Sequence, residues 1–359
     1  MPDRLRKGTV GSISSARQHS GKGPVISEDS RARTVREVGE FAVIDRITAG
    51  RRQGAQVLLG PGDDAAVVAA PDGRFVVSTD MLVEGRHFRL DWSAPTEIGR
   101  KAIAQNAADV VSMGARPTAF VVALGCPGDT PVAVLEDITE GMWTEAERAG
   151  GSIVGGDLVH SEYLVISVTA FGDLGGRAAI TRAGARPGDI VAVAGELGWS
   201  GAGLAVLSGD ADIADPAFAR ALAAHRAPRP PYAAVVDIVG DAGPTALTDV
   251  SDGLLADLGH LARASGVAID VRGAALTDPD LDAVATRLDA DAAQWILSGG
   301  EDHAFAGTWP SGTALPPGWR PIGVVAAGDG VTVDGDAPSG GIGWESFHGS
   351  GAAPVGPKR

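Results

Sequence analysis

Six short segments of this sequence place carboxylates beside glycines or near the expected ends of strands. The segments are Gly62-Asp63-Asp64, Ser78-Thr79-Asp80, Asn106 through Asp109, Gly155-Gly156-Asp157, Asp249-Val250-Ser251-Asp252 and Gly300-Glu301-Asp302. Two carboxylates about 4 Å apart repel each other by roughly 4 kcal/mol at an effective dielectric constant near 20. A fold that gathers several of them therefore needs cations, and oxygen donors with little His or Cys nearby favour Mg²⁺. Because Mg²⁺ binds through carboxylates, waters and substrate phosphates, the pattern predicts a nucleotide phosphate as substrate.

Each of these acids also has an ordinary structural explanation. Asp252 precedes an expected helix and could cap its first turn, and Asp157 follows glycines as turn residues often do. Asp80 follows an apolar run, so we expect it at the end of a strand, where sites usually form. Asn106 and Asp109 are three residues apart on an expected helix and therefore share a face. The residues alone leave open whether these side chains meet in space.

The elements that must position these residues follow from the hydrophobic pattern. Apolar residues at helical spacing predict helices near residues 35–47, 96–113, 135–146, 201 onward and 254–261. Short β-rich runs predict strands near 65–69, 74–79, 118–124, 163–170, 189–194 and 267–271. Strands and helices mix without strict βαβ alternation, which predicts a mixed α+β architecture rather than a doubly wound sheet.

The length of 359 residues suits two domains of ordinary size. The Arg-, Ser- and Gly-rich start lacks the apolar segment of a signal peptide, and we expect a disordered extension there. The predicted division is residues 1–33 as that extension, 34–178 and 179–348 as two domains, and 349–359 as a flexible tail.

Composition excludes several classes of function. The net charge of −15 argues against nucleic-acid partners and anionic membrane surfaces, both of which need a basic footprint. Cys126 stands alone, which excludes an intrachain disulfide and a Cys-based zinc site and favours a reducing, cytoplasmic compartment. No apolar run of roughly 18 residues is present, so no transmembrane helix is expected. The sequence also lacks a G-x-x-x-x-G-K-[ST] motif, so an ATP site here is not a P-loop.

The same segments, in the same order, resemble the thiamine-monophosphate kinase family, a branch of the aminoimidazole-ribonucleotide-synthetase-like ATP enzymes. The resemblance covers roughly residues 35 to 348. Its most specific block runs from Ser78 through Thr-Asp-Met-Leu-Val-Glu-Gly to His87-Phe88, and further matches are Gly39-Glu40-Phe41, Gly62 to Val67, Gly99 to Pro117, Gly155 to Asp157, Thr181 to Ala185, Asp249 to Leu254 and Gly299 to Asp302.

The resemblance implies direct transfer of the ATP γ-phosphoryl group to thiamine monophosphate, giving thiamine diphosphate with several Mg²⁺ ions per site. It implies two domains with the site between them, ATP and Mg²⁺ bound by the N-terminal domain, and a homodimer formed by the N-terminal halves. The implied metal ligands are Asp64, Ser78, Thr79, Asp80, Asp109, Asp157, Asp249 and Asp252. The implied ATP contacts are Gly156, Asp157, Arg182 and Ser251, and the implied substrate contacts are His87, Glu301 and Trp344.

The implied chemistry agrees with the residue types. An ionised phosphate acceptor needs no covalent protein nucleophile, so catalysis rests on screening and aligning two polyanions. Arg182 is expected to neutralise charge on the transferred group. An aromatic such as Trp344 can stack on the flat rings of the substrate, and core packing or a lid contact is the alternative for this residue. Lys101 is expected to be a solvated helix residue rather than an ATP ligand.

Two alternatives remain open at this point. The first is another ATP-using enzyme of the same superfamily, and the second is a non-catalytic metal- or nucleotide-binding protein. The chain departs from the family pattern at Leu158 and at His303-Ala304, where the family usually has Thr and an aromatic-Glu pair respectively. The second departure leaves the fine substrate specificity open.

Overall fold

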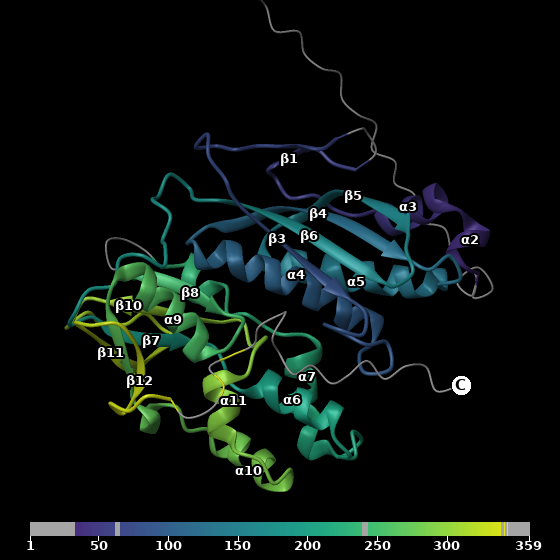
Figure 1. Ribbon diagram of the computed structural model, residues 1–359. Coiled ribbons are helices and arrows are strands. Elements are labelled where there is room, and N and C mark those ends of the chain that lie inside the picture. The colour runs from purple at the N-terminus through teal and green to yellow at the C-terminus, as the bar shows by residue number, and fades with distance from the viewer. Residues whose placement is uncertain (1–32, 62–64, 239–242, 339–340, 342, 344–359) are drawn as a thin grey trace, which may run out of the picture.

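The computed structural model describes residues 33–61, 65–238, 243–338, 341 and 343, and this part of the chain is built on two sheets (Figure 1). The first sheet has the order β3-β6-β4-β5, with β4 and β5 parallel and the other neighbours antiparallel. Its strands are β3 (Val76–Val83), β4 (Arg116–Cys126), β5 (Ser152–His160) and β6 (Val165–Asp173).

Helices α4 (Pro95–Ser112) and α5 (Val132–Ala149) cover one face of this sheet and pack closely on each other. Pro95 occupies the first turn of α4, and the Glu97 carboxylate accepts a hydrogen bond of 2.8 Å from the Ala94 N–H. These are the start signals that fix the register of the helix. The register of α4 decides which of its polar residues face β3.

The second sheet has six strands in the order β12-β9-β11-β7-β10-β8. They are β7 (Ile190–Ala194), β8 (Ala246–Val250), β9 (Ala268–Val271), β10 (Ala304–Trp309), β11 (Trp319–Ala326) and β12 (Gly330–Val333). Helix α9 (Leu254–Ser265) contacts three of these strands, while α6 (Trp199–Ser208) packs against α7 (Ala219–Arg226). The α+β prediction is confirmed, whereas the domain boundaries given above stay predictions.

The remaining elements are short. They are α2 (Val35–Val38), α3 (Glu40–Thr48), α8 (Ala233–Val236), α10 (Pro279–Arg287), α11 (Ala292–Ser298), β1 (Val57–Leu59), β2 (Val67–Val68) and the 3₁₀ turns Pro216–Phe218 and Gly273–Ala275. No helix among the described residues is long and apolar enough to cross a membrane.

A continuous apolar core joins the two halves. Phe305, Trp309 and Trp319 of the second sheet belong to the same buried cluster as Ile98 and Phe120 of the first half. The Trp309 and Trp319 rings meet edge to face, with centroids 4.4 Å apart. Helix α4, which lies between the two sheets in Figure 1, contacts β8 as well as β3. Polar groups carried on α4 therefore face both halves.

The other face of the first sheet exposes apolar side chains. Val77, Met81, Val121 and Val159 are between 37% and 53% exposed, and in β3 and in the middle of β4 exposed residues alternate with less exposed ones. We call this surface the open face. An exposed apolar sheet face of this kind is typical of an interaction surface.

Close contact between α4 and α5 depends on glycine. A β-carbon at Gly99 would collide with the carbonyl oxygen of Ile138. We expect Gly99→Ala to lower the free energy of unfolding by about 1–3 kcal/mol in urea titrations, because the helices must move apart. Gly259→Ala is the matched control, because that helical glycine faces open space, and it should be neutral or stabilise by about 0.5–1 kcal/mol. Equal stability of the two variants would contradict this account of the helix contact.

Candidate functional site

Two hydrogen bonds fasten β3 to α4 at the predicted acidic residues. The backbone N–H of Asp80 donates to Asn106 Oδ1 at 2.9 Å, and Ser78 Oγ donates to Asp109 Oδ2 at 2.7 Å. Asn106 is fully buried, and its amide nitrogen donates to the carbonyl of Ala102 on its own helix. Asn106 and Asp109 thus share a face, as their spacing predicts. The prediction that Asp80 ends a strand is wrong, because β3 continues to Val83 and Asp80 lies within it facing α4.

The second half contributes Asp249, which lies near the end of β8 and is almost completely buried. His303 Nδ1 lies 3.3 Å from Asp249 Oδ2, and both side chains are at most 6% exposed. Burial opposes a charged imidazole, but the hydrogen bond and charge of Asp249 prevail and raise the pKa of His303. Sequence reasoning did not select His303 as a site residue. The available signal was its departure from the family pattern after Glu301-Asp302.

Carboxylates from the two halves meet at Asp109, which Asp80 and Asp249 approach closely enough to influence its ionisation. Burial raises the pKa of Asp109 to about 7, and the charges of Asp249 and Asp80 add to this rise. Burial also raises the pKa of Asp80, with a further contribution from Asp249 and an opposing one from His303. The three carboxylates offer hard oxygen ligands, and Asp80 and Asp109 are costly in their charged forms, so this group suits a divalent cation such as Mg²⁺.

A second acidic group lies where β8 leads into α9. Ligand atoms of Asp252, Asp257 and His260 all lie within 4.8 Å of one another. The cap hypothesis for Asp252 is wrong, because the N-cap of α9 is Gly253. Instead Asp257 Oδ2 accepts the N–H groups of Asp252 and Gly253 at 3.0 and 3.2 Å. Burial, reinforced by the charges of Asp249 and Asp252, raises the pKa of Asp257 to about 8.

Glu301 lies at the centre of a separate ionic group. Its carboxylate is 2.8 Å from Lys101 Nζ and 3.5 Å from His225 Nδ1. Burial opposes ionisation of Glu301, but Lys101 and then His225 lower its pKa to about 2. Lys101 Nζ also donates to the carbonyl of His87 at 3.0 Å, which brings the two predicted substrate contacts, His87 and Glu301, to one lysine. The expectation that Lys101 is solvated is wrong, because its side chain is 3% exposed.

Asp302, unlike its neighbour Glu301, binds backbone N–H groups rather than charged side chains. Its two carboxylate oxygens accept the N–H groups of Gly198 and Ser200 at 2.6 and 2.9 Å. These donors lie at the start of α6, whose own N-cap, Gly198, has no side chain to cap it. Burial raises the pKa of Asp302 to about 7 in spite of these two hydrogen bonds. Asp302 therefore caps a helix that lies about a hundred residues earlier in the chain.

Some of the predicted site residues point elsewhere. Thr79 Oγ1 donates to the Val168 carbonyl and lies 3.1 Å from Thr169 Oγ1, on the open face rather than with Asp80. Asp157 lies on edge strand β5, opposite Ala123 of β4, and is exposed on that same open face. Three strand spacings of about 4.8 Å separate β5 from β3, so this chain does not bring Asp157 to Asp80.

The remaining predicted site residues lie on several different elements. Gly156 has a structural role, since a β-carbon there would collide with the carbonyl oxygen of Val122. Arg182 is exposed; its Nε donates to Thr248 Oγ1 at 3.2 Å, and its charge acts on Asp252. The Ser251 carbonyl accepts the Glu301 N–H at 2.7 Å. Asp64 and Trp344 lie outside the described residues.

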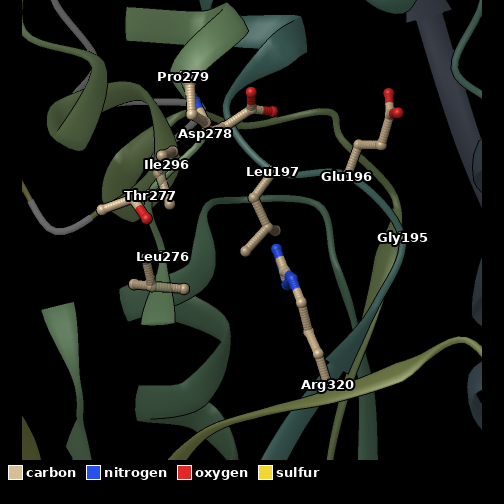
Figure 2. Close-up of a pocket in the computed structure, with 9 residues that line it drawn as sticks. All are labelled: Gly195, Glu196, Leu197, Leu276, Thr277, Asp278, Pro279, Ile296 and Arg320. Atoms are coloured by element: carbon tan, nitrogen blue, oxygen red, sulfur yellow. The ribbon is translucent and has the colours of Figure 1, made fainter. Parts of the chain in front are cut away.

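A pocket of about 250 Å³ lies away from these acids, between the β7–α6 loop and the start of α10 (Figure 2). Leu197, Leu276 and Ile296 line it, and the Arg320 guanidinium points toward Leu197. None of the predicted site residues lines this pocket. Asp80 and Asp109, whose pKa values are raised by burial and by Asp249 of the other half, lie instead between the two halves, and perturbed groups of that kind mark functional sites. We therefore place the candidate site there.

Comparison with known proteins gives consistent matches over both halves. Residues 62–174 match the family model "AIR synthase related protein, N-terminal domain", and residues 186–293 match the corresponding C-terminal domain. A thiamine-monophosphate kinase of Mycobacterium tuberculosis is 55% identical over 320 residues, which covers 88% of this chain and 93% of that relative.

Solved structures agree. The thiamine-monophosphate kinase of Stenotrophomonas maltophilia K279a is 33% identical with a TM-score of 0.74, covering 84% of this chain and 98% of its own. The structure of AaThiL complexed with AMPPCP and TMP is 32% identical with a TM-score of 0.69, covering 86% of this chain and 97% of its own.

The raised pKa of Asp302 has a consequence for stability. A folded-state pKa of about 7, above the ordinary 3.8, means that Asp302 favours folding most below pH 4 and loses that contribution as pH rises to 7. The difference in unfolding free energy between wild type and Asp302→Asn should therefore shrink by more than about 1 kcal/mol from pH 5 to pH 8. Asp291→Asn, which exchanges one N-cap side chain of α11 for another that also accepts the Ala293 N–H, is the control and should change the unfolding free energy little. A pH-independent difference for Asp302→Asn would contradict the burial account.

Proposed function

Because the chain belongs to the thiamine-monophosphate kinase family, we propose that it transfers the γ-phosphoryl group of ATP to thiamine monophosphate in a single in-line step. A phosphate oxygen of the acceptor forms a bond to the γ-phosphorus, the bond to the bridging β,γ-oxygen breaks, and ADP leaves. The products are thiamine diphosphate and ADP. The observation that supports this most directly is the convergence of Asp80, Asp109 and Asp249 from both halves of the molecule.

We assign Asp80, Asp109 and Asp249, together with Asp252, to holding Mg²⁺. The donor set fits that ion, since the acids supply hard oxygens, and burial together with the charge of Asp249 raises the pKa values of Asp80, Asp109 and Asp252. When bound, Mg²⁺ neutralises phosphate charge and orients the oxygens of a transferring group. Ser78 and Asn106 hold the acids in place from β3 and α4.

Arg182 and Ser251 are proposed to contact ATP. The Arg182 guanidinium is exposed near Asp252, and its Nε is fixed by Thr248. A fixed cation at this point stabilises negative charge that develops on the transferred group. No side chain is assigned as a covalent nucleophile, because the acceptor oxygen is already ionised.

His87 and Glu301 are proposed to contact thiamine monophosphate. Glu301 is held ionised, and its side chain is 32% exposed beside otherwise buried partners. An ionised carboxylate at an opening complements the cationic thiazolium ring of the acceptor. Stacking of Trp344 on the substrate rings remains a prediction. The cytoplasmic location of the protein also remains a prediction.

We also propose that two copies pair through the open face. The face is apolar at Val77, Met81, Val121 and Val159, and it carries Thr79 and Asp157, which this chain leaves apart from its own acidic group. Covering such a face with a second copy would remove its apolar surface from water.

A coupled assay tests the proposed activity. Purified protein with ATP, Mg²⁺ and thiamine monophosphate should form thiamine diphosphate and ADP in equal amounts. Free thiamine should not replace the acceptor, because it has no phosphate oxygen to receive the group. Absence of product with thiamine monophosphate, from protein that still binds ATP, would contradict the proposal and favour another enzyme of the superfamily.

Asp109→Asn tests the cation assignment. We expect activity to fall by at least about a hundredfold while the fold is kept, because Asn still accepts the Ser78 hydrogen bond. At pH 8 without Mg²⁺ the variant should be at least as stable as wild type, since the raised pKa of Asp109 makes its charge costly. Mg²⁺ should raise the melting temperature of wild type but raise that of the variant much less. The surface variant Asp45→Asn should behave as wild type, and undiminished Mg²⁺ stabilisation of Asp109→Asn would exclude this ligand.

Val121→Glu tests the proposed pairing. A charge in the middle of the open face should convert a dimer into a monomer in light scattering, because a carboxylate cannot be buried there without a partner. Val324→Glu is the control, since Val324 is similarly exposed (41% against 37%) but lies on β11 in the other half. A dimer that survives Val121→Glu would show that pairing uses another surface.

A further inference from the structure

Residues Gly299 to His303 form a strap that connects three parts of the molecule. The side chains of Glu301, Asp302 and His303 contact Lys101, the start of α6 and Asp249 respectively. Glu301 and His303 have φ values of 66° and 51°, in the left-handed region that L-residues with side chains seldom occupy. Such a backbone persists only where surrounding contacts hold it. The contacts of the strap side chains therefore decide where Glu301 lies.

Lys101 supplies the contact from the first half. It lies on α4, is buried, and directs its Nζ to the Glu301 carboxylate and to the carbonyl of His87. A buried ammonium is strongly disfavoured without a counter-charge, so the lysine and the glutamate hold each other in place. His225 of α7 approaches the other Glu301 oxygen and lies 3.2 Å from Ser200 Oγ. The Glu301 carboxylate therefore contacts Lys101 through one oxygen and His225 through the other, while the side chain remains 32% exposed.

Lys101 has no assigned part in the chemistry, and it is too deeply buried to meet a substrate directly. Its geometry links the two residues proposed to contact the acceptor, His87 through the backbone and Glu301 through the side chain. We propose that Lys101 is a positioning residue that sets affinity for the cationic acceptor, by fixing Glu301 across the junction of the two halves. This inference rests on the proposed function for the identity of the acceptor.

The main competing explanation is a purely structural ion pair. In that case loss of Lys101 would weaken the fold and disturb ATP and acceptor alike. If Lys101 acts through Glu301, its loss should change acceptor binding selectively, and it should change nothing further once Glu301 has lost its charge. Double-mutant analysis separates these two outcomes.

The experiment compares Lys101→Met, Glu301→Gln and the double variant by steady-state kinetics. Lys101→Met should raise KM for thiamine monophosphate about tenfold and leave KM for ATP within about twofold. The double variant should match Glu301→Gln alone. Because the double variant contains neither charge, it avoids the unpaired, partly buried glutamate that could unfold Lys101→Met. Equal loss for both substrates, or a further acceptor loss of about tenfold on adding Lys101→Met to Glu301→Gln, would overturn the proposal.

Arg287→Met is the matched control. It removes a long cation from an exposed ion pair with Asp215, 3.1 Å apart, and should leave both KM values unchanged. Wild-type protein without activity on thiamine monophosphate would refute the proposed function rather than the positioning role. Hydrogen exchange of the Glu301 and His303 amides, which donate to Ser251 and Val250, tests that role without any substrate. These amides should exchange faster in Lys101→Met than in wild type and Arg287→Met, and unchanged exchange would overturn the inference.

Discussion

Repulsion between carboxylates held close together is the constraint on which this structure depends. Asp80 and Asp109 come from the first half and Asp249 from the second, and the charge of Asp249 adds to the cost of ionising the buried Asp80 and Asp109. Such groups separate unless the surrounding structure holds them. Ser78 donates a hydrogen bond to Asp109, Asn106 accepts one from the Asp80 backbone N–H, and His303 lies within hydrogen-bond distance of Asp249. The shared apolar core around Trp309 and Trp319 fixes the halves to each other. The acidic group between the two halves therefore destabilises the fold, and the shared apolar core offsets this cost, as is usual at functional sites.

The strap from Gly299 to His303 shows how a few residues can connect distant elements. Its three consecutive side chains contact an ammonium on α4, the first turn of α6 and a carboxylate on β8. The left-handed backbone at Glu301 and His303 is what sends these side chains in different directions. A movement of the strap would therefore shift Glu301, the contact of Asp302 with the start of α6 and the contact of His303 with Asp249 at the same time.

The first sheet serves two purposes through its two faces. Alternation along β3 turns Ser78 and Asp80 toward α4, while Val77, Thr79 and Met81 face away. One face therefore carries part of the acidic group, and the other is the apolar open face proposed to pair with a second copy. Because the side-chain period of a strand is two, a shift of one residue in register would exchange these roles, and the hydrogen bond from Asp80 to Asn106 opposes that shift.

The sequence by itself determined the mixed α+β class, about half of the helices and strands, the shared face of Asn106 and Asp109, and the family. These features depend on local periodicity, turn residues and contiguous motifs, all of which the chain carries in order. Tertiary structure alone decided that Lys101 is buried against Glu301, 200 positions away, and that Asp302 caps α6. It also decided that Asp80 lies inside its strand and that Asp257, not Asp252, binds the backbone at the start of α9. Ion pairs and caps between remote residues depend on how the elements pack in three dimensions, and no local pattern in the sequence specifies that packing.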